Sequence, residues 1–73
     1  PLIKSRQPVK IEPAGWEDVK QGDIVYCKVK GNYYTHLVSA VDANKGCQIS
    51  NNSGYVNGWT KNVFGKVIEI LKA

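Results

Sequence analysis

The chain has 73 residues, 42% hydrophobic and 22% charged, which suits one small domain near the lower size limit for independent folding. This length argues against a deep cleft between two lobes, and the composition argues against a disordered chain. Ten Lys and Arg residues against six Asp and Glu give a net charge of +4, which favours polyanions only weakly because the basic residues are spread along the chain.

The sequence predicts a cytoplasmic protein without a membrane anchor. No segment reaches the roughly 18 apolar residues of a membrane-spanning helix, and no charged and then apolar leader is present. Cys27 and Cys47 form no C-x-x-C pair, and the chain has a single histidine to join them. We therefore expect two reduced, buried thiols, no metal site and no cofactor, while a disulfide between them stays open.

The first fifteen residues contain all three prolines, which exclude a helix and favour an extended arm or an edge strand. We expect a short strand at residues 8–12. The following segment, WEDVKQGD, is predicted to be a turn because Gly22 can take a positive φ and Asp23 can bond its own backbone. Trp16 is expected to pack over the core before the first long strand.

Residues 23–42 are predicted to form a β-hairpin. The segment DIVYCKVK alternates between two kinds of side chain, which is typical of a strand with one buried face. The buried face would carry Val25, Cys27 and Val29, and the exposed face Tyr26, Lys28 and Lys30. Gly31-Asn32 then predicts a two-residue turn, and YYTHLVSAVD the antiparallel partner strand.

The rest of the chain predicts further short strands. ANKG is expected to be a turn, CQIS a strand, NNSGYVNGWTKN a loop, and VFGKVIEILK a last strand, with one helical turn near residues 60–64. Short strands between Gly-rich turns predict one all-β domain over residues 1–73. Its expected form is a small SH3-like or signal-peptidase-like barrel of four to six antiparallel strands, which would remove most exposed strand edges.

Four motifs follow one another in a familiar order: GDIV at 22–25, THLVSAVD at 35–42, QISNN at 48–52 and FGKVIEI at 64–70. This order resembles the β-barrel domain of the superfamily that joins signal peptidases with the LexA-like, self-cleaving SOS repressors. The resemblance implies a peptidase-like barrel and a phage or prophage origin.

The resemblance also places the catalytic elements of the superfamily on this chain. His36 falls on the position of the general base, and the nucleophile motif S-M-x-P is matched only by SRQP, in which Ser5 is followed by Arg6 instead of Met. The acid falls on Asn51 or its neighbours, where no carboxylate stands. A serine needs a base, and the base needs an orienting group, so we expect no catalytic residues in this protein.

Three functions compete on these residues. The first is a non-enzymatic binding module that contacts a protein or small ligand through its loops, since Asn and aromatic side chains suit recognition. Its candidate binding residues are Tyr34, His36, Asn51, Asn52, Tyr55, Asn57 and Trp59. The same Asn and Gly residues also serve turns, and Trp59 can simply cap the end of the barrel.

The second function is single-stranded nucleic-acid binding, which small barrels support with aromatic platforms and basic residues. Its candidate residues are Tyr26, Lys28, Lys30, Lys61 and Lys66. The third is a residual serine peptidase that uses Ser5 and His36. We expect a protein partner in preference to nucleic acid, and the oligomeric state stays open.

Overall fold

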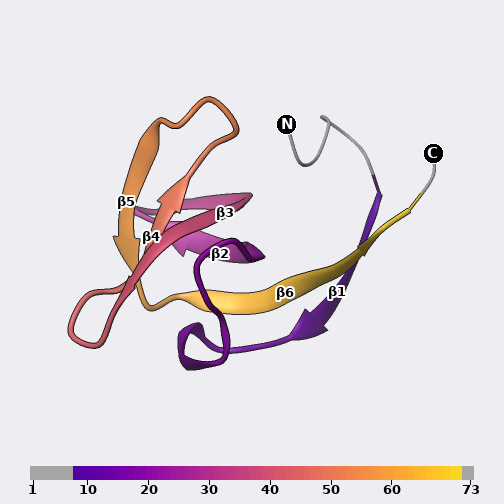
Figure 1. Ribbon diagram of the computed structural model, residues 1–73, viewed down its shortest axis with the longest axis horizontal. Helices are drawn as coiled ribbons and strands as arrows, with labels where there is room; N and C mark the ends of the chain where they lie inside the picture. Colours follow the sequence, from indigo (N-terminus) through magenta and orange to yellow (C-terminus); the bar gives the residue numbers. More distant parts are fainter. Residues whose placement is uncertain (1–7, 72–73) are drawn as a thin grey trace.

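The computed structural model describes residues 8–71, which form six antiparallel strands in one sheet (Figure 1). The strands are β1 (Val9–Pro13), β2 (Ile24–Val29), β3 (Asn32–Asp42), β4 (Gly46–Ser50), β5 (Val56–Thr60) and β6 (Val63–Ile70). Their order in the sheet is β1-β6-β2-β3-β4-β5. A short 3-10 helix, η1 (Trp16–Asp18), follows β1. The prediction of an all-β, barrel-like domain is thus confirmed.

The sheet curls into a ring because β5 runs almost directly into β6. Only Lys61 and Asn62 separate the two strands, and β6 then pairs with β2. Two hydrogen bonds tie this bend to β2: Lys28 N–H donates to Asn62 O at 2.9 Å, and Thr60 Oγ1 donates to Lys28 O at 2.7 Å. Beyond the ring, β6 continues beside β1 as a two-stranded ribbon (Figure 1).

The predicted hairpin is present, but its turn lies one residue earlier than expected. Val29 pairs with Asn32, so the two turn residues are Lys30 and Gly31, with φ of 50° and 86°. Positive φ at both positions defines the turn type whose twist matches a β-hairpin. Lys30 therefore belongs to the turn and not to the exposed face of the strand.

The core lies inside the ring and is built from small and β-branched side chains. Its buried residues are Val19, Val25, Cys27, Val29, Val38, Cys47, Ile49 and Val63. The buried face predicted for the first long strand is thus confirmed. Trp16 is partly buried and packs against the core, as predicted.

The prediction of a loop over NNSGYVNGWTKN is wrong in its second half, which forms β5. Its pairing with β4 is interrupted by a bulge, in which Ile49 lies opposite Gly58 and Ser50 lies opposite Val56. The extra residue, Asn57, breaks the alternation that would have indicated a strand. The predicted helical turn near residues 60–64 is also wrong, because this stretch links β5 to β6 without a helix.

The two thiols are buried and unpaired, as predicted. Burial, and to a lesser degree the nearby Cys47, raises the pKa of Cys27 from 9.0 to about 11. Burial likewise raises the pKa of Cys47. Because the thiolate is the reactive form, both groups should be poor nucleophiles in the folded protein.

This burial predicts slow thiol labelling and a specific loss of stability in alkali. We expect Ellman's reagent to label the native protein far more slowly than the urea-unfolded chain. Since folded Cys27 holds its proton more tightly, its contribution to stability is complete below pH 9.0 and is lost as the pH rises toward 11, by about 2 kcal/mol. Urea unfolding at several pH values measures this loss, and a Cys27→Ala variant should show a smaller one. Equal losses in both proteins would contradict the assignment.

Candidate binding site

Among the residues predicted to bind a partner through the loop after β4, Asn51 forms hydrogen bonds within the loop itself. Asn51 Oδ1 accepts hydrogen bonds from the backbone N–H groups of Ser53 at 2.9 Å and Tyr55 at 3.0 Å. The Asn51 backbone closes the same loop, with its N–H donating to Tyr55 O at 2.9 Å. Asn51 therefore holds the loop in shape, which is the structural role open to any Asn in a turn.

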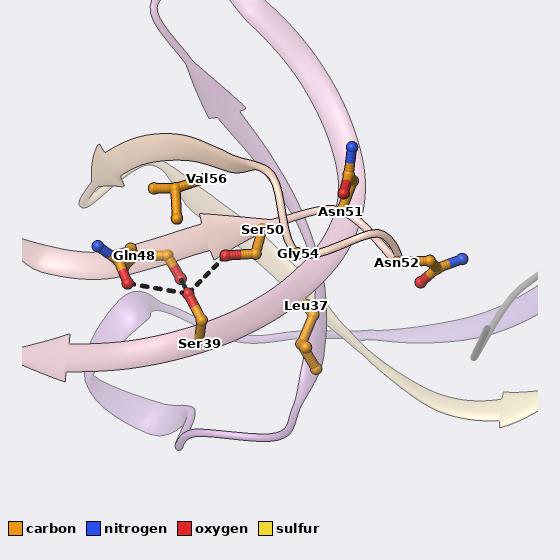
Figure 2. Close-up of a pocket in the computed structure, with 8 residues that line it drawn as sticks. All are labelled: Leu37, Ser39, Gln48, Ser50, Asn51, Asn52, Gly54 and Val56. Atoms are coloured by element: carbon orange, nitrogen blue, oxygen red, sulfur yellow. Dashed lines mark hydrogen bonds between the residues drawn. The ribbon is translucent and has the colours of Figure 1, made fainter.

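A shallow pocket of about 370 Å³ lies on the outer surface of β3 and β4 beside this loop (Figure 2). It is lined by Leu37, Ser39, Gln48, Ser50, Asn51, Asn52, Gly54 and Val56. None of these side chains is charged, so the pocket suits a neutral group. The prediction that Asn51 and Asn52 are binding residues stays untested, although both line a pocket.

Hydrogen-bonding side chains converge at one end of this pocket (Figure 2). Ser39 Oγ lies 2.7 Å from Ser50 Oγ and 3.1 Å from Gln48 Oε1. A third acceptor, Gln48 O, lies 3.2 Å away. The hydroxyls and the amide oxygen thus satisfy one another, which explains how Ser50 can be buried in the structure without a cost in unpaired polar groups.

A second group of predicted residues meets at one side chain, His36. Its ring stacks on Tyr34 with 4.8 Å between the centroids, and its Nδ1 lies 3.0 Å from Asn57 Oδ1. Because an amide oxygen only accepts, this contact places the proton of a neutral imidazole on Nδ1 and leaves Nε2 as the acceptor. The structure thus provides an orienting group for His36, but it is the amide of Asn57 and not a carboxylate.

The remaining predicted binding residues lie apart from His36 and from one another. Trp59 pairs in register with Gln48 on the outer surface, and Lys45 Nζ lies 5.3 Å from the centre of its ring. Tyr55 lies in the loop that Asn51 holds, and it is 67% exposed. The predicted binding set is therefore split between three places, because β5 intervenes where a single loop was expected. Ser5, the proposed nucleophile, lies outside the described residues.

The most distinctive surface feature is a cluster of three exposed aromatic rings, which we call the aromatic face. Tyr26 on β2, Tyr33 on β3 and Phe64 on β6 have ring centroids 5.7 to 6.1 Å apart. They remain 36%, 57% and 46% exposed. Tyr26 and Tyr33 are nearly parallel, with 16° between their planes. The Phe64 ring is tilted by 50° and 34° against the Tyr26 and Tyr33 rings, so the three rings form one continuous aromatic cluster on the outside of the ring of strands.

Strand register explains how these rings come together. Tyr26 pairs with Thr35 and Lys28 with Tyr33, so Tyr26 and Tyr33 are diagonal neighbours on the same face of the hairpin. Phe64 joins them because β6 pairs with the other side of β2 and shifts register beside Tyr26. The alternation of the hairpin could have indicated the tyrosine pair, whereas Phe64 needed knowledge of the long-range pairing.

The residues proposed for nucleic acid are only partly gathered here. Lys28 belongs to the aromatic face, with its Nζ 5.3 Å from the centre of the Tyr33 ring. Lys61 lies over the Trp16 ring instead, and Lys66 Nζ is 3.9 Å from Glu12 Oε1. The side chain of Lys30 lies over Gly58, close to where a Cβ on that glycine would be. Only Tyr26 and Lys28 of this set therefore share a surface.

Aliphatic side chains extend the aromatic face along the sheet. Ile24 pairs with Leu37 on the same side of β2 and β3 as Tyr26. On β1, Ile11 is 41% exposed and approaches Gly65, the residue opposite Tyr26. Exposed apolar patches of this kind are typical of docking surfaces, because a monomeric protein gains nothing from leaving them in water.

The described residues offer no metal site and no membrane-spanning helix. Within residues 8–71, no three His, Cys, Asp or Glu side chains are placed to hold a metal ion. In the same part of the chain, no helix is long and apolar enough to cross a membrane. Comparisons of the chain with protein-family models, with characterised proteins and with solved structures find no match.

Proposed function

We propose that this protein is a non-enzymatic binding module whose partner is a protein, and that the aromatic face is its contact surface. The observation that carries the proposal is the exposure of Tyr26, Tyr33 and Phe64 side by side. Tyrosine and phenylalanine supply large, rigid contact areas at a low cost in side-chain entropy, and they are enriched at interfaces. The core does not require these rings, since aliphatic residues and thiols fill it.

The contacts of His36 support the part of this proposal that assigns no catalytic activity to the protein. Within residues 8–71, its side-chain partners are the Tyr34 ring and the Asn57 amide. Neither is a serine, a cysteine or a carboxylate, whereas a peptidase site needs a nucleophile beside the imidazole and a group that orients it.

The relationship to the signal peptidase and SOS-repressor superfamily, with a phage or prophage origin and an SH3-like or peptidase-like barrel, stays a proposal. It is supported by the placement of three of the motifs, at 22–25, 35–42 and 64–70, on neighbouring strands of the barrel. A cytoplasmic location is proposed with it, because Cys27 and Cys47 are free thiols of the kind that a reducing compartment maintains.

A second candidate function, single-stranded nucleic-acid binding, is favoured by Lys28 beside Tyr33. A ring with an ammonium group next to it can stack a base and neutralise the adjoining phosphate. Lys66 forms an ion pair with Glu12, whereas Lys28, Lys45 and Lys61 each lie over an aromatic ring. The aliphatic extension through Ile24 and Leu37 fits a protein partner better, because it offers no further positive charge.

One pair of matched variants tests both functions. Tyr33→Ser removes the most exposed ring of the aromatic face, and Tyr55→Ser removes an even more exposed tyrosine that lies outside it. Each immobilised protein is exposed to an extract of the source organism, and the retained proteins are identified by mass spectrometry. We expect partners that bind the wild type and Tyr55→Ser, with retention reduced at least tenfold for Tyr33→Ser, as for an interface hot spot.

The same proteins are then titrated with a random single-stranded oligonucleotide at low and moderate salt. Binding that falls steeply with salt and disappears in Tyr33→Ser would replace the protein partner with nucleic acid. If neither the extract nor the oligonucleotide distinguishes Tyr33→Ser from Tyr55→Ser, the aromatic face is not the contact surface.

A further inference from the structure

β1 leaves one side of its backbone unpaired at the edge of the sheet. It pairs with β6 on one side only, and no other strand of the described residues reaches its outer side. Leu71 N–H donates to Pro8 O at 2.9 Å, and Ala14 N–H donates to Phe64 O at 3.2 Å. Alternate residues of an antiparallel strand bond the same neighbour, so Val9, Ile11 and Pro13 direct their backbone groups away from β6.

The side chains of this edge strand are sorted by charge. Register pairs Lys10 with Glu69 and Glu12 with Lys66, which places opposite charges on one face of the ribbon. The other face carries the aliphatic residues, with Val9 opposite Ile70 and Ile11 opposite Val67. Ile11 and Ile70 are each 41% exposed. An isolated two-stranded ribbon with an uncovered apolar face is only marginally stable in water.

We propose that the occupant of this edge is a second copy of the chain, whose β1 pairs antiparallel with β1 about a two-fold axis at Ile11. In this register Ile11 lies opposite Ile11 of the second copy, and Lys10 lies opposite its Glu12. Lys10 and Glu12 are at non-hydrogen-bonded positions, where opposing side chains approach most closely. Each strand therefore meets the opposite charge of its copy at two positions.

The charge pattern selects both the occupant and the register. An axis at Lys10 would bring two lysines together, and an axis at Glu12 would bring two glutamates together, both of which are destabilising across a strand pair. Only the axis at Ile11 pairs both charges. A strand of another protein would need the same reversed pattern, whereas a second copy supplies it by symmetry.

The single proline of this strand, Pro13, costs the pairing only the bond that its missing N–H would donate to the Val9 carbonyl of the second copy. The two Ile11 residues exchange both of their backbone hydrogen bonds at the axis. Val9 N–H then faces the carbonyl of Pro13 in the second copy, and that bond does not need the N–H that proline lacks. The shared strand is five residues long. Such a contact is far smaller than a standard interface, so we expect a weak dimer with a Kd on the order of 100 μM.

Sedimentation of the complete chain over concentrations reaching the millimolar range tests the dimer. Ile11→Pro removes an N–H that points away from β6, so it costs no bond within the chain, and Ile11→Ala keeps that N–H as the matched control. We expect the wild type to dimerise, Ile11→Ala to dimerise more weakly, and Ile11→Pro to be monomeric. A monomeric wild type, or an Ile11→Pro dimer as tight as that of Ile11→Ala, would overturn the proposal.

A charge exchange tests the register without touching the backbone. Lys10→Glu and Glu12→Lys should each raise the Kd at least fivefold, because each places like charges opposite one another at two positions. The double variant restores opposite charges across the axis, and its Kd should return to within about twofold of the wild type. Within one chain, the double variant places a glutamate opposite Glu69 and a lysine opposite Lys66. The free energy of unfolding of the monomer should therefore not return to that of the wild type.

A double variant as weak as either single variant would exclude this register. Tyr33→Ser serves as the control for the second surface, because it lies on the aromatic face and not on β1. Dimerisation should be unchanged in Tyr33→Ser. Its loss would place the second copy on the aromatic face instead and would overturn the proposal.

Discussion

Gly46→Ala should destabilise the protein by about 3 kcal/mol or more, which is a large part of the stability of so small a domain. Gly46 begins β4 with a φ of +90°, a backbone conformation that residues with a Cβ rarely adopt. A Cβ at this position would overlap the backbone carbonyl oxygen of Thr60. Thr60 is buried and bonded to the backbone of Lys28, so it cannot move aside without opening the bend between β5 and β6.

Gly31→Ala separates the cost of a positive φ from the cost of the overlap with Thr60, which Gly46→Ala combines. Gly31 has a similar φ of +86°, but a Cβ there would have nothing within 4 Å. Its replacement should therefore cost only the strain of the left-handed conformation, about 1 to 2 kcal/mol. Urea unfolding followed by tryptophan fluorescence measures both variants. Equal losses would show that β4 and β5 do not approach as closely as the structure indicates.

Ile49→Ala should cost about 2 to 5 kcal/mol and is expected to leave a substantial fraction of the chain unfolded at room temperature. Ile49 is fully buried at the centre of the ring, opposite Val38 on β3 and Gly58 on β5. Removing three carbon atoms there leaves a cavity in the core inside the ring, and the paired strands around it cannot collapse freely to fill it. The same urea titration measures the loss.

Ile68→Ala is the matched control for Ile49→Ala. The two substitutions remove the same atoms, but Ile68 is 47% exposed on the ribbon, so we expect a loss below about 1 kcal/mol. Wild-type stability in Ile49→Ala would mean that the centre of the barrel is not packed. A loss as large in Ile68→Ala would mean that this side chain is covered in solution.

The two candidate binding surfaces of the molecule differ in how they depend on the fold. The aromatic face lies over hydrogen-bonded strands, so its rings are held in place by the register of β2, β3 and β6. The pocket beside the loop after β4 depends on the bonds that Asn51 makes within that loop. A surface on regular strands is better preorganised than one on a loop, and this is a further reason to place the contact surface on the aromatic face.

The sequence by itself determined the strands that a short stretch of residues is enough to indicate. Alternation of side chains placed the hairpin and its buried face of Val25, Cys27 and Val29, because a strand with one buried side must repeat every two residues. The prolines indicated an extended N-terminal segment, now seen as β1 (Val9–Pro13), and the β-branched run near the C-terminus indicated the last strand. The paired tyrosines of the aromatic face were within reach of the same reasoning.

Only the tertiary structure decided the elements that depend on distant partners. β5 carries a bulge at Asn57, so its strand character comes from pairing with β4 and not from its own pattern. The meeting of Asn57 with His36, and of Phe64 with Tyr26, joins residues far apart in the chain. Register between non-adjacent strands is set by the closure of the whole ring, and no local sequence pattern encodes which residues closure brings together.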